Sequence, residues 1–217
     1  MGNIMNPDNK FFRGVGKVID CVFISILWFV FCIPIFTFGA STTAMYYTVH
    51  KTIRNDKGYV WRTFWGSFKS NFKQTTIITL ILLVIAVVLW IDQDIMLTLL
   101  QEGSKMGYLY FAFIVLLCFL YVWAVYIFSY SARFEDKLKT VLKNSISLAI
   151  VHLPSSFFML VILAVASFVA WLIPPLLLIL PCLICLLNNL FLERIFRKYM
   201  SEEDLAKELE DDYINRD

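Results

Sequence analysis

Long stretches without a charged side chain constrain this sequence more than any other feature. They occur at residues 21–50, 74–91, 106–132 and 144–192. A helix that crosses a membrane needs about 20 mostly apolar residues, so the last stretch accommodates two helices and each of the others accommodates one. Pro174-Pro175 divides the last stretch, because proline ends a helix and restricts the residue before it. We therefore predict membrane spans near 18–38, 75–91, 107–130, 151–173 and 176–192.

The composition supports a membrane protein. Of the 217 residues, 59% are hydrophobic and 17% are charged, whereas about 25% of the residues of a soluble domain are charged. Apolar surface on this scale exceeds what a globule of this length can bury, so the lipid bilayer is the expected partner. The net charge of +2 gives no basis for nucleic-acid binding. We predict an all-α fold, a polytopic α-helical membrane protein with about five transmembrane helices, forming one domain over 1–200 with an acidic tail over 201–217.

No motif of a familiar enzyme class is present, and neither a catalytic residue, a metal ligand nor a cofactor is predicted. Cys182 and Cys185 lie in an apolar segment, where we expect them to pack as small apolar residues. Ionisable residues at membrane depth would indicate a function, but only Asp20 and His152 come near that position, both close to the predicted cytoplasmic interface. A proton-coupled pump is expected to bury a carboxylate within a span, so this class of protein is disfavoured, and an enzyme is not expected.

Basic residues determine the predicted orientation. Segments 51–73 and 133–143 and the residues after the last span are rich in Lys and Arg, whereas 92–105 is acidic. The positive-inside rule places the basic segments and the C-terminus in the cytoplasm. The N-terminus is basic as well, although one span separates it from 51–73. Either the N-terminus lies outside, or the chain enters the membrane and returns within 18–50.

The uncharged stretch PIFTFGASTTAMYY favours such a return. Pro34 ends a helix, and Gly39 accepts backbone angles that other residues avoid. Ser41 or Thr42 can then cap a new helix. We predict a short re-entrant or interfacial helix over about 40–55, and the alternative is a plain loop just outside the membrane.

Small residues in this stretch have the spacing of close helix contacts. Residues four apart, such as Gly39 and Thr43, lie on one helix face and let helices approach closely in lipid. Asparagine side chains near the end of the last span can hydrogen bond across helices, and we expect at least one to do so. The candidate helix-packing or polar-lining residues are Gly39, Ala40, Ser41, Thr42, Thr43, Ala44, Asn188 and Asn189.

Residues 59–73, YVWRTFWGSFKSNFK, combine aromatic and basic side chains. The aromatic residues recur at i, i+3, i+4, i+7 and i+11, which places them on one face of a helix with basic residues on its flank. This pattern is typical of an amphipathic helix in the lipid headgroup layer. We predict that it anchors the next span, with partner binding as the alternative. The predicted interfacial anchor residues are Trp61, Arg62, Phe64, Trp65, Phe68, Lys69, Phe72 and Lys73.

The composition becomes acidic after Lys198. Ser201 precedes Asp204 by three residues, as in a capping box, and predicts a short cytoplasmic helix over about 202–212. Its acidic residues form a solvated face or meet a basic surface.

Three blocks resemble the YesL-like membrane proteins, a bacterial family of unknown function. They read PIFTFGASTTAMYY, FWGSFKSNFKQ and ARFEDKLKTVLKNSISLAIVHLP. The resemblance extends over nearly the whole chain, and its most specific part is Pro-x-x-Thr-x-Gly-Ala-x-x-Thr-Ala. It implies a multi-pass protein of the bacterial plasma membrane and a link to carbohydrate use, but it supplies no catalytic residues.

Three functions follow as expectations. The first, which we favour, is a non-catalytic protein accessory to carbohydrate uptake or utilisation that contacts a sugar permease complex. The second is a small channel or facilitator lined by Ser41, Thr42, Thr43 and Asn188. The third is a membrane sensor or regulator whose tail over 201–217 is its output. No oligomeric state is predicted.

Overall fold

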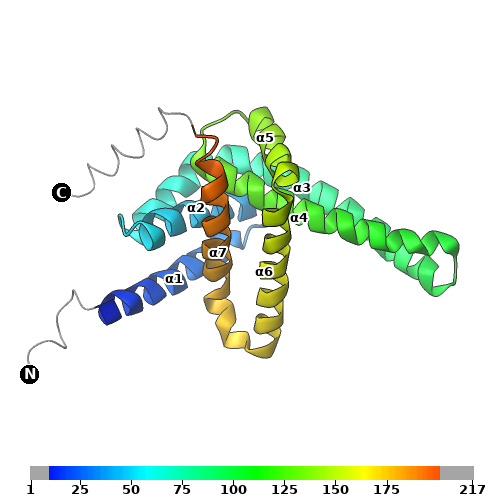
Figure 1. The fold of residues 1–217 in the computed structure, drawn as a ribbon, viewed down its shortest axis with the longest axis horizontal. Helices are drawn as coiled ribbons and strands as arrows, with labels where there is room; N and C mark the ends of the chain where they lie inside the picture. Colours follow the sequence, from blue (N-terminus) through cyan, green and yellow to red (C-terminus); the bar gives the residue numbers. More distant parts are fainter. Residues whose placement is uncertain (1–9, 201–217) are drawn as a thin grey trace, which may run out of the picture.

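The computed structural model describes residues 10–200, and every regular element within them is helical (Figure 1). The α-helices are α1 (Lys10–Cys32), α2 (Phe38–Thr48), α3 (Val60–Gln101), α4 (Leu109–Arg133), α5 (Leu138–Val151), α6 (Leu153–Leu172) and α7 (Leu180–Phe196). Short 3-10 helices η1 (Ile35–Thr37), η3 (Lys105–Tyr108) and η4 (Pro174–Leu178) and the π-helix η2 (Val49–Arg54) join them. The predicted all-α fold is confirmed. The helix predicted over 202–212 lies outside the described residues.

Four of the described helices are long and apolar enough to cross a membrane, namely α1, α3, α4 and α6. They contain the cores of the first four predicted spans. The fifth predicted span, 176–192, falls on η4 and α7, and α7 has 17 residues. Large apolar side chains such as Phe168 and Trp171 point away from the protein on α6. Lipid is the phase that can cover such a surface.

The predicted break at Pro34 is confirmed, because α1 ends at Cys32. The hydroxyl of Thr37 donates hydrogen bonds to the carbonyl oxygens of Phe31 (2.5 Å) and Pro34 (2.6 Å). Phe31 lies in the last turn of α1, where the backbone carbonyls have no partner within the helix. The Thr37 side chain therefore fastens the turn between α1 and α2.

The helix predicted over about 40–55 is present as α2 followed by η2. It begins at Phe38, and no side chain caps it. The predicted cap by Ser41 or Thr42 is wrong, because η1 leads into α2 without an extended residue between them. Helix α2 packs against α1, α3, α4 and α7, so this short uncharged helix forms the centre of the bundle (Figure 1).

Helix α3 is one continuous helix of 42 residues. At 1.5 Å per residue it is about 63 Å long, roughly twice the hydrocarbon thickness of a bilayer. The aromatic-basic segment, the span at 75–91 and most of the predicted acidic loop 92–105 are thus consecutive parts of α3 rather than separate elements. Helix α3 pairs with α4 in a hairpin that extends from the rest of the molecule (Figure 1). Gly103, with φ +78°, begins its tight turn.

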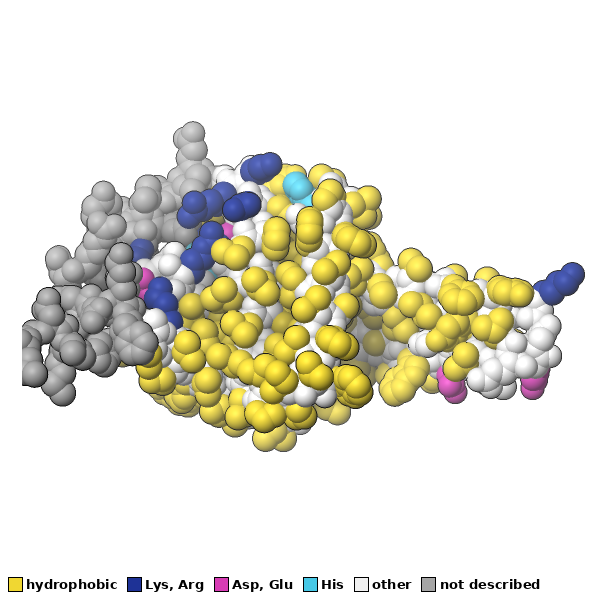
Figure 2. Space-filling model, turned by 60° about the horizontal axis from the view of Figure 1, so that its bottom comes forward, with side chains coloured by type: hydrophobic (Ala, Val, Ile, Leu, Met, Phe, Trp, Pro, Cys, Tyr) yellow, Lys and Arg dark blue, Asp and Glu magenta, His cyan; other side chains and the backbone are white. Residues whose placement is uncertain are grey.

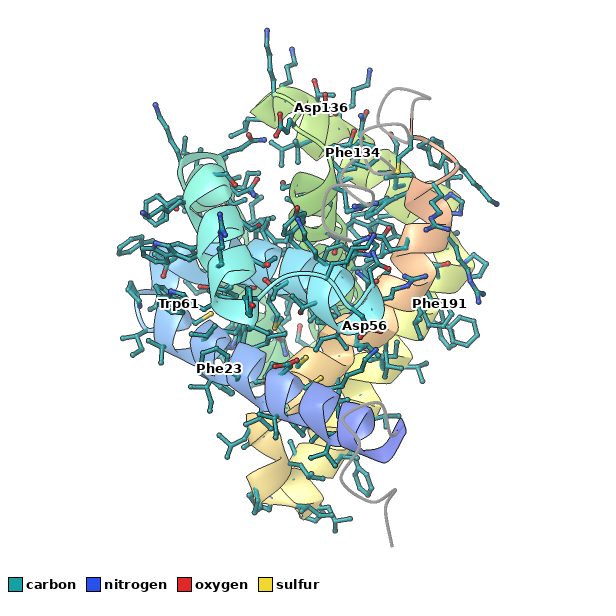
Figure 3. All side chains as sticks on the ribbon, turned by 90° about the vertical axis from the view of Figure 1, so that its left-hand side faces the viewer. Phe23, Asp56, Trp61, Phe134, Asp136 and Phe191 are labelled. Carbon is teal, nitrogen blue, oxygen red and sulfur yellow. The ribbon has the colours of Figure 1, made fainter. Side chains whose placement is uncertain are left out.

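Part of the aromatic face of α3 belongs to the protein core. Phe64 and Phe68 are buried, and their ring centroids lie 5.6 Å and 4.9 Å from that of Phe31 on α1. The prediction that this whole face enters the headgroup layer is wrong for Phe64 and Phe68, because α1 covers them. Trp61, one turn earlier, is exposed and lies at the flank of the molecule (Figure 3).

Charged side chains gather at two distant places on the described surface (Figure 2). Most of the Lys and Arg side chains in this view lie at one end of the compact part, whereas the α3–α4 hairpin carries acidic side chains near its tip together with the exposed Lys105, with hydrophobic side chains between the two places. We call the first of these the basic end. It is formed by segments 51–73 and 133–143 and by the end of α7. This separation is the pattern on which the predicted orientation depends.

Candidate functional site

Glu193 places a carboxylate inside the helix bundle near the basic end. Its side chain is 1% exposed. The carboxylate oxygen Oε1 accepts a hydrogen bond of 3.0 Å from the Tyr46 hydroxyl. The same oxygen lies 3.1 Å from Nε of Arg133 and 3.5 Å from Nδ1 of His50. Helices α2, η2, α4 and α7 therefore meet at one carboxylate, and we call these four residues the Glu193 cluster.

A second contact lies one turn along α7 from Glu193. Nη1 of Arg54 donates to the Asn189 backbone oxygen (3.1 Å) and to its side-chain oxygen (2.9 Å). This is the interhelical hydrogen bond expected of an asparagine in the last span. Tyr46, His50 and Arg54 are spaced four apart along α2 and η2, as are Asn189 and Glu193 on α7, so two helix faces are matched. The run includes the π-helix η2, a rare element that often occurs at functional sites.

The Glu193 cluster holds the helices in register. A charge removed from water is costly unless a partner and hydrogen bonds compensate for it. Here the groups around the Glu193 carboxylate come from α2, η2 and α4. Displacing any of these three elements would therefore leave the buried charge of Glu193 with fewer partners. The sequence prediction concerned carboxylates in the middle of a span, and it did not identify Glu193, which is buried in the last turn of α7. Counting charges ended the last span at 192, whereas α7 continues to Phe196.

A polar hollow of about 1200 Å³ opens at the basic end beside this cluster. One part of its lining is the beginning of α3, and another is the segment 131–136, which comprises the end of α4 and the start of the loop to α5. Figure 3 shows Phe134 and Asp136 of this segment close to α5. The remaining lining comes from Tyr47 and Lys51 and from the 58–59 turn. Arg133 contributes both to this lining and to the Glu193 cluster.

The predicted packing residues of α2 lie apart from the hollow. Gly39, Ala40, Ser41, Thr43 and Ala44 are buried, whereas Thr42 is partly exposed and accepts a 3.1 Å hydrogen bond from Trp28 Nε1. The Gly39 amide donates to Thr79 Oγ1 on α3 at 3.1 Å. Asn188 is buried on α7. None of these residues, nor Asn189, lines the hollow, so the structure does not bring the predicted polar lining together there.

The predicted anchor residues divide into four groups. Arg62 lines the hollow, while Trp61, Lys69 and Lys73 are exposed. Lys69 Nζ lies 4.9 Å from the centroid of the Trp65 ring. Trp65 and Phe72 are partly buried against the core. The remaining two are the core residues Phe64 and Phe68.

The two ionisable residues singled out from the sequence lie outside the cluster. Asp20 is partly exposed on α1, and His152 lies between α5 and α6, with Nε2 3.4 Å from the Tyr199 hydroxyl. No group of three or more His, Cys, Asp or Glu residues in the described part of the chain is arranged to hold a metal ion.

Long apolar helices around a short central helix, with a charged cluster at one end, define a polytopic helical membrane protein. Residues 21–93 match the model of a family described as "Protein of unknown function, DUF624". This is the family to which YesL-like proteins belong. No curated protein matches the chain, and no solved structure does. The matched residues run from α1 through α2 and η2 into α3, so they contain Tyr46, His50 and Arg54 but not Glu193 or Arg133.

Proposed function

We propose that the chain is a non-catalytic multi-pass protein of the bacterial plasma membrane that acts as an accessory subunit in carbohydrate uptake. In this proposal its basic end faces the cytoplasm, where it contacts a sugar permease complex. The observation that carries the non-catalytic part is the Glu193 cluster. Oε1 of this carboxylate accepts a hydrogen bond from Tyr46 and lies beside Arg133, which suits a residue that fixes helices. The carbohydrate link rests on the resemblance to the YesL-like proteins.

The surface of the molecule supports an accessory role. The α3–α4 hairpin extends away from the bundle and exposes apolar side chains, among them Val84, Val88 and Val115. Along this part each helix packs mainly on the other, which leaves their outer faces open to lipid or to another membrane helix. The basic end adds exposed cations, including Lys69 and Lys73. A helical partner with an acidic cytoplasmic loop would match both surfaces.

Co-purification from native membranes tests this proposal. The tagged full-length chain is isolated in mild detergent from cells grown on a polysaccharide, and the accompanying proteins are quantified. We expect permease subunits in near-stoichiometric amount, and we expect fewer of them with Lys69→Glu and Lys73→Glu together. Lys105→Glu at the hairpin tip is the matched control. Recovery of the chain without permease subunits would contradict the proposal.

A facilitator is the second candidate, because the hollow has a polar lining. Reconstituted protein would then accelerate the movement of a small sugar into liposomes. Equal rates in protein-containing and empty liposomes would exclude this function.

A further inference from the structure

The hollow at the basic end is a built polar site rather than a gap between helices. Its lining includes six residues with neutral hydrogen-bonding side chains in addition to two tyrosines. The six are Thr63, Ser67, Ser70, Asn71, Gln74 and Ser131. At about 1200 Å³ it exceeds the usual volume of a site for one small molecule, about 300–1,000 Å³. A single inorganic ion would leave most of it empty.

One buried hydroxyl on this lining has no partner within the protein. Ser131 is 5% exposed, and its Oγ makes no hydrogen bond to any part of the chain that the structure describes. A buried hydroxyl without a hydrogen bond is unfavourable, so native proteins supply a partner, whether protein, water or ligand. Ser131 belongs to the lining of the hollow, so a water or ligand that settles against it is one source of a partner for its buried Oγ.

The hollow is lined by three basic side chains, Lys51, Arg62 and Arg133, and two acidic ones, Glu135 and Asp136. Asp136 accepts a 2.6 Å hydrogen bond from the Tyr130 hydroxyl, and Glu135 is exposed to solvent. Arg133 is engaged with Glu193. Lys51 and Arg62 also line the hollow, and neither has an acidic partner within ion-pair distance among residues 10–200.

The two cations reach the hollow from two different elements. Lys51 comes from η2, and its Nζ lies 5.7 Å from the centroid of the Tyr47 ring, which also lines the hollow. Arg62 comes from the first turn of α3. A guanidinium presents a planar pair of donors that matches a phosphate, and an ammonium adds a point charge to it. The hydroxyl and amide groups farther along α3 are suited to ligand hydroxyls.

We propose that this hollow binds a phosphate ester that carries free hydroxyl groups, with its phosphate on Lys51 and Arg62 and its hydroxyls toward Ser67, Asn71 and Ser131. The tyrosine rings at the rim pack against the carbon skeleton of the ligand. Two sources have this chemistry, the glycerol-phosphate headgroup of an anionic lipid and a soluble sugar phosphate. The assignment does not depend on the proposed partnership with a permease.

The test uses the full-length protein in nanodiscs and separates the two sources. In one arm, nanodiscs of phosphatidylcholine are titrated calorimetrically with glucose 6-phosphate and with glycerol 3-phosphate. In the other arm, nanodiscs contain phosphatidylglycerol, and native mass spectrometry counts the lipids that remain bound after delipidation. We expect saturable binding of one equivalent in at least one arm, and the arm identifies the source.

The variants are Lys51→Ala, Arg62→Ala and Ser131→Ala, with Lys73→Ala as control because Lys73 is exposed on α3 outside the hollow. Loss of a hydrogen bond to a charged group weakens binding about tenfold or more, which is the change expected for Lys51→Ala and Arg62→Ala. Ser131→Ala should weaken binding less, and Lys73→Ala should leave it unchanged. Absence of binding in both arms, or an equal loss with Lys73→Ala, would overturn the assignment.

Discussion

Lys17 on α1 and Asp56 in the turn after η2 form an ion pair, with Nζ 2.7 Å from Oδ1. The Lys17 ammonium also donates a 2.9 Å hydrogen bond to the backbone oxygen of Ile53. The first turns of α1 and the end of η2 therefore lie at the same end of the molecule. Of the two topologies that the sequence leaves open, this contact supports the one in which the chain enters and returns within 18–50.

The first prediction concerns this topology. If α1 and α2 enter and return, an N-terminal epitope tag and a C-terminal one lie on the same side of the membrane. We expect both tags to be digested by protease in inside-out vesicles and protected in right-side-out vesicles. A tag inserted at Gly103, in the hairpin turn, is the control and should behave in the opposite way. Opposite accessibility of the two terminal tags would contradict the re-entrant arrangement.

The second prediction concerns the turn that makes the return possible. Thr37→Val removes the hydroxyl that binds the carbonyls of Phe31 and Pro34 but preserves the shape of the side chain. The net loss for one such hydrogen bond is about 1 kcal/mol. Thermal unfolding in detergent should show a lower midpoint.

Thr98→Val provides the control for this prediction. Thr98 is exposed on α3, and its hydroxyl donates to the Asp94 backbone oxygen at 3.1 Å. Water replaces this bond after substitution, so the unfolding midpoint should change little. A decrease as large as that of Thr37→Val would show that the turn has no special role.

Hydropathy and turn residues were sufficient to predict the four long apolar helices, but not helix α5 or the continuation of α3 through 92–101. Charge-free stretches of membrane length located α1, α3, α4 and α6, and Pro34 located the break between α1 and α2. These features are local, because a membrane helix satisfies its own backbone and depends on its own side chains for solubility in lipid. The aromatic-basic pattern also identified a helix, but not that α1 covers Phe64 and Phe68, since an apolar face does not reveal whether protein or lipid lies against it.

The Glu193 cluster could not be found by the same means. Glu193 and Arg133 each follow an apolar stretch, so charge counting assigns both to loops. Only the tertiary structure brings Glu193 and Arg133 together with His50, which is the last residue of the charge-free stretch 21–50. One sequence pattern did carry information: Asn189 and Glu193 are four apart, as are Tyr46 and His50. Such pairs place polar groups on one helix face, although spacing alone does not show that the two faces meet.

The third prediction concerns the Glu193 cluster. Glu193→Gln keeps the shape of the side chain and removes its charge, which leaves Arg133 buried beside a neutral group. Breaking a buried ion pair in this way costs about 3–5 kcal/mol. We expect a large decrease in the unfolding midpoint, whereas Glu135→Gln, on an exposed carboxylate, should have little effect.

A double substitution separates structure from function at this cluster. Arg133→Met with Glu193→Leu replaces the ion pair with apolar side chains, which restores much of the stability when the pair is structural. Recovery of the unfolding midpoint together with normal co-purification of permease subunits is the expected result. A restored unfolding midpoint without co-purification of permease subunits would instead assign the carboxylate a functional role, and it would contradict the scaffold interpretation.

The last prediction concerns the close approach of α2 to its neighbours. A Cβ atom at Gly39 would overlap Thr79 Oγ1 and the Phe128 ring and would lie 2.9 Å from the Thr75 backbone oxygen. Because a backbone atom is among the obstacles, Gly39→Ala must push α2 away from α3, and such overpacking costs about 1–3 kcal/mol. Gly16→Ala on α1 is the matched control, since a Cβ there meets no atom within 4 Å, and it should stabilise the helix by up to about 1 kcal/mol. Unfolding midpoints that move in opposite directions for these two substitutions would support close packing at Gly39, and equal midpoints would show that α2 has room to move.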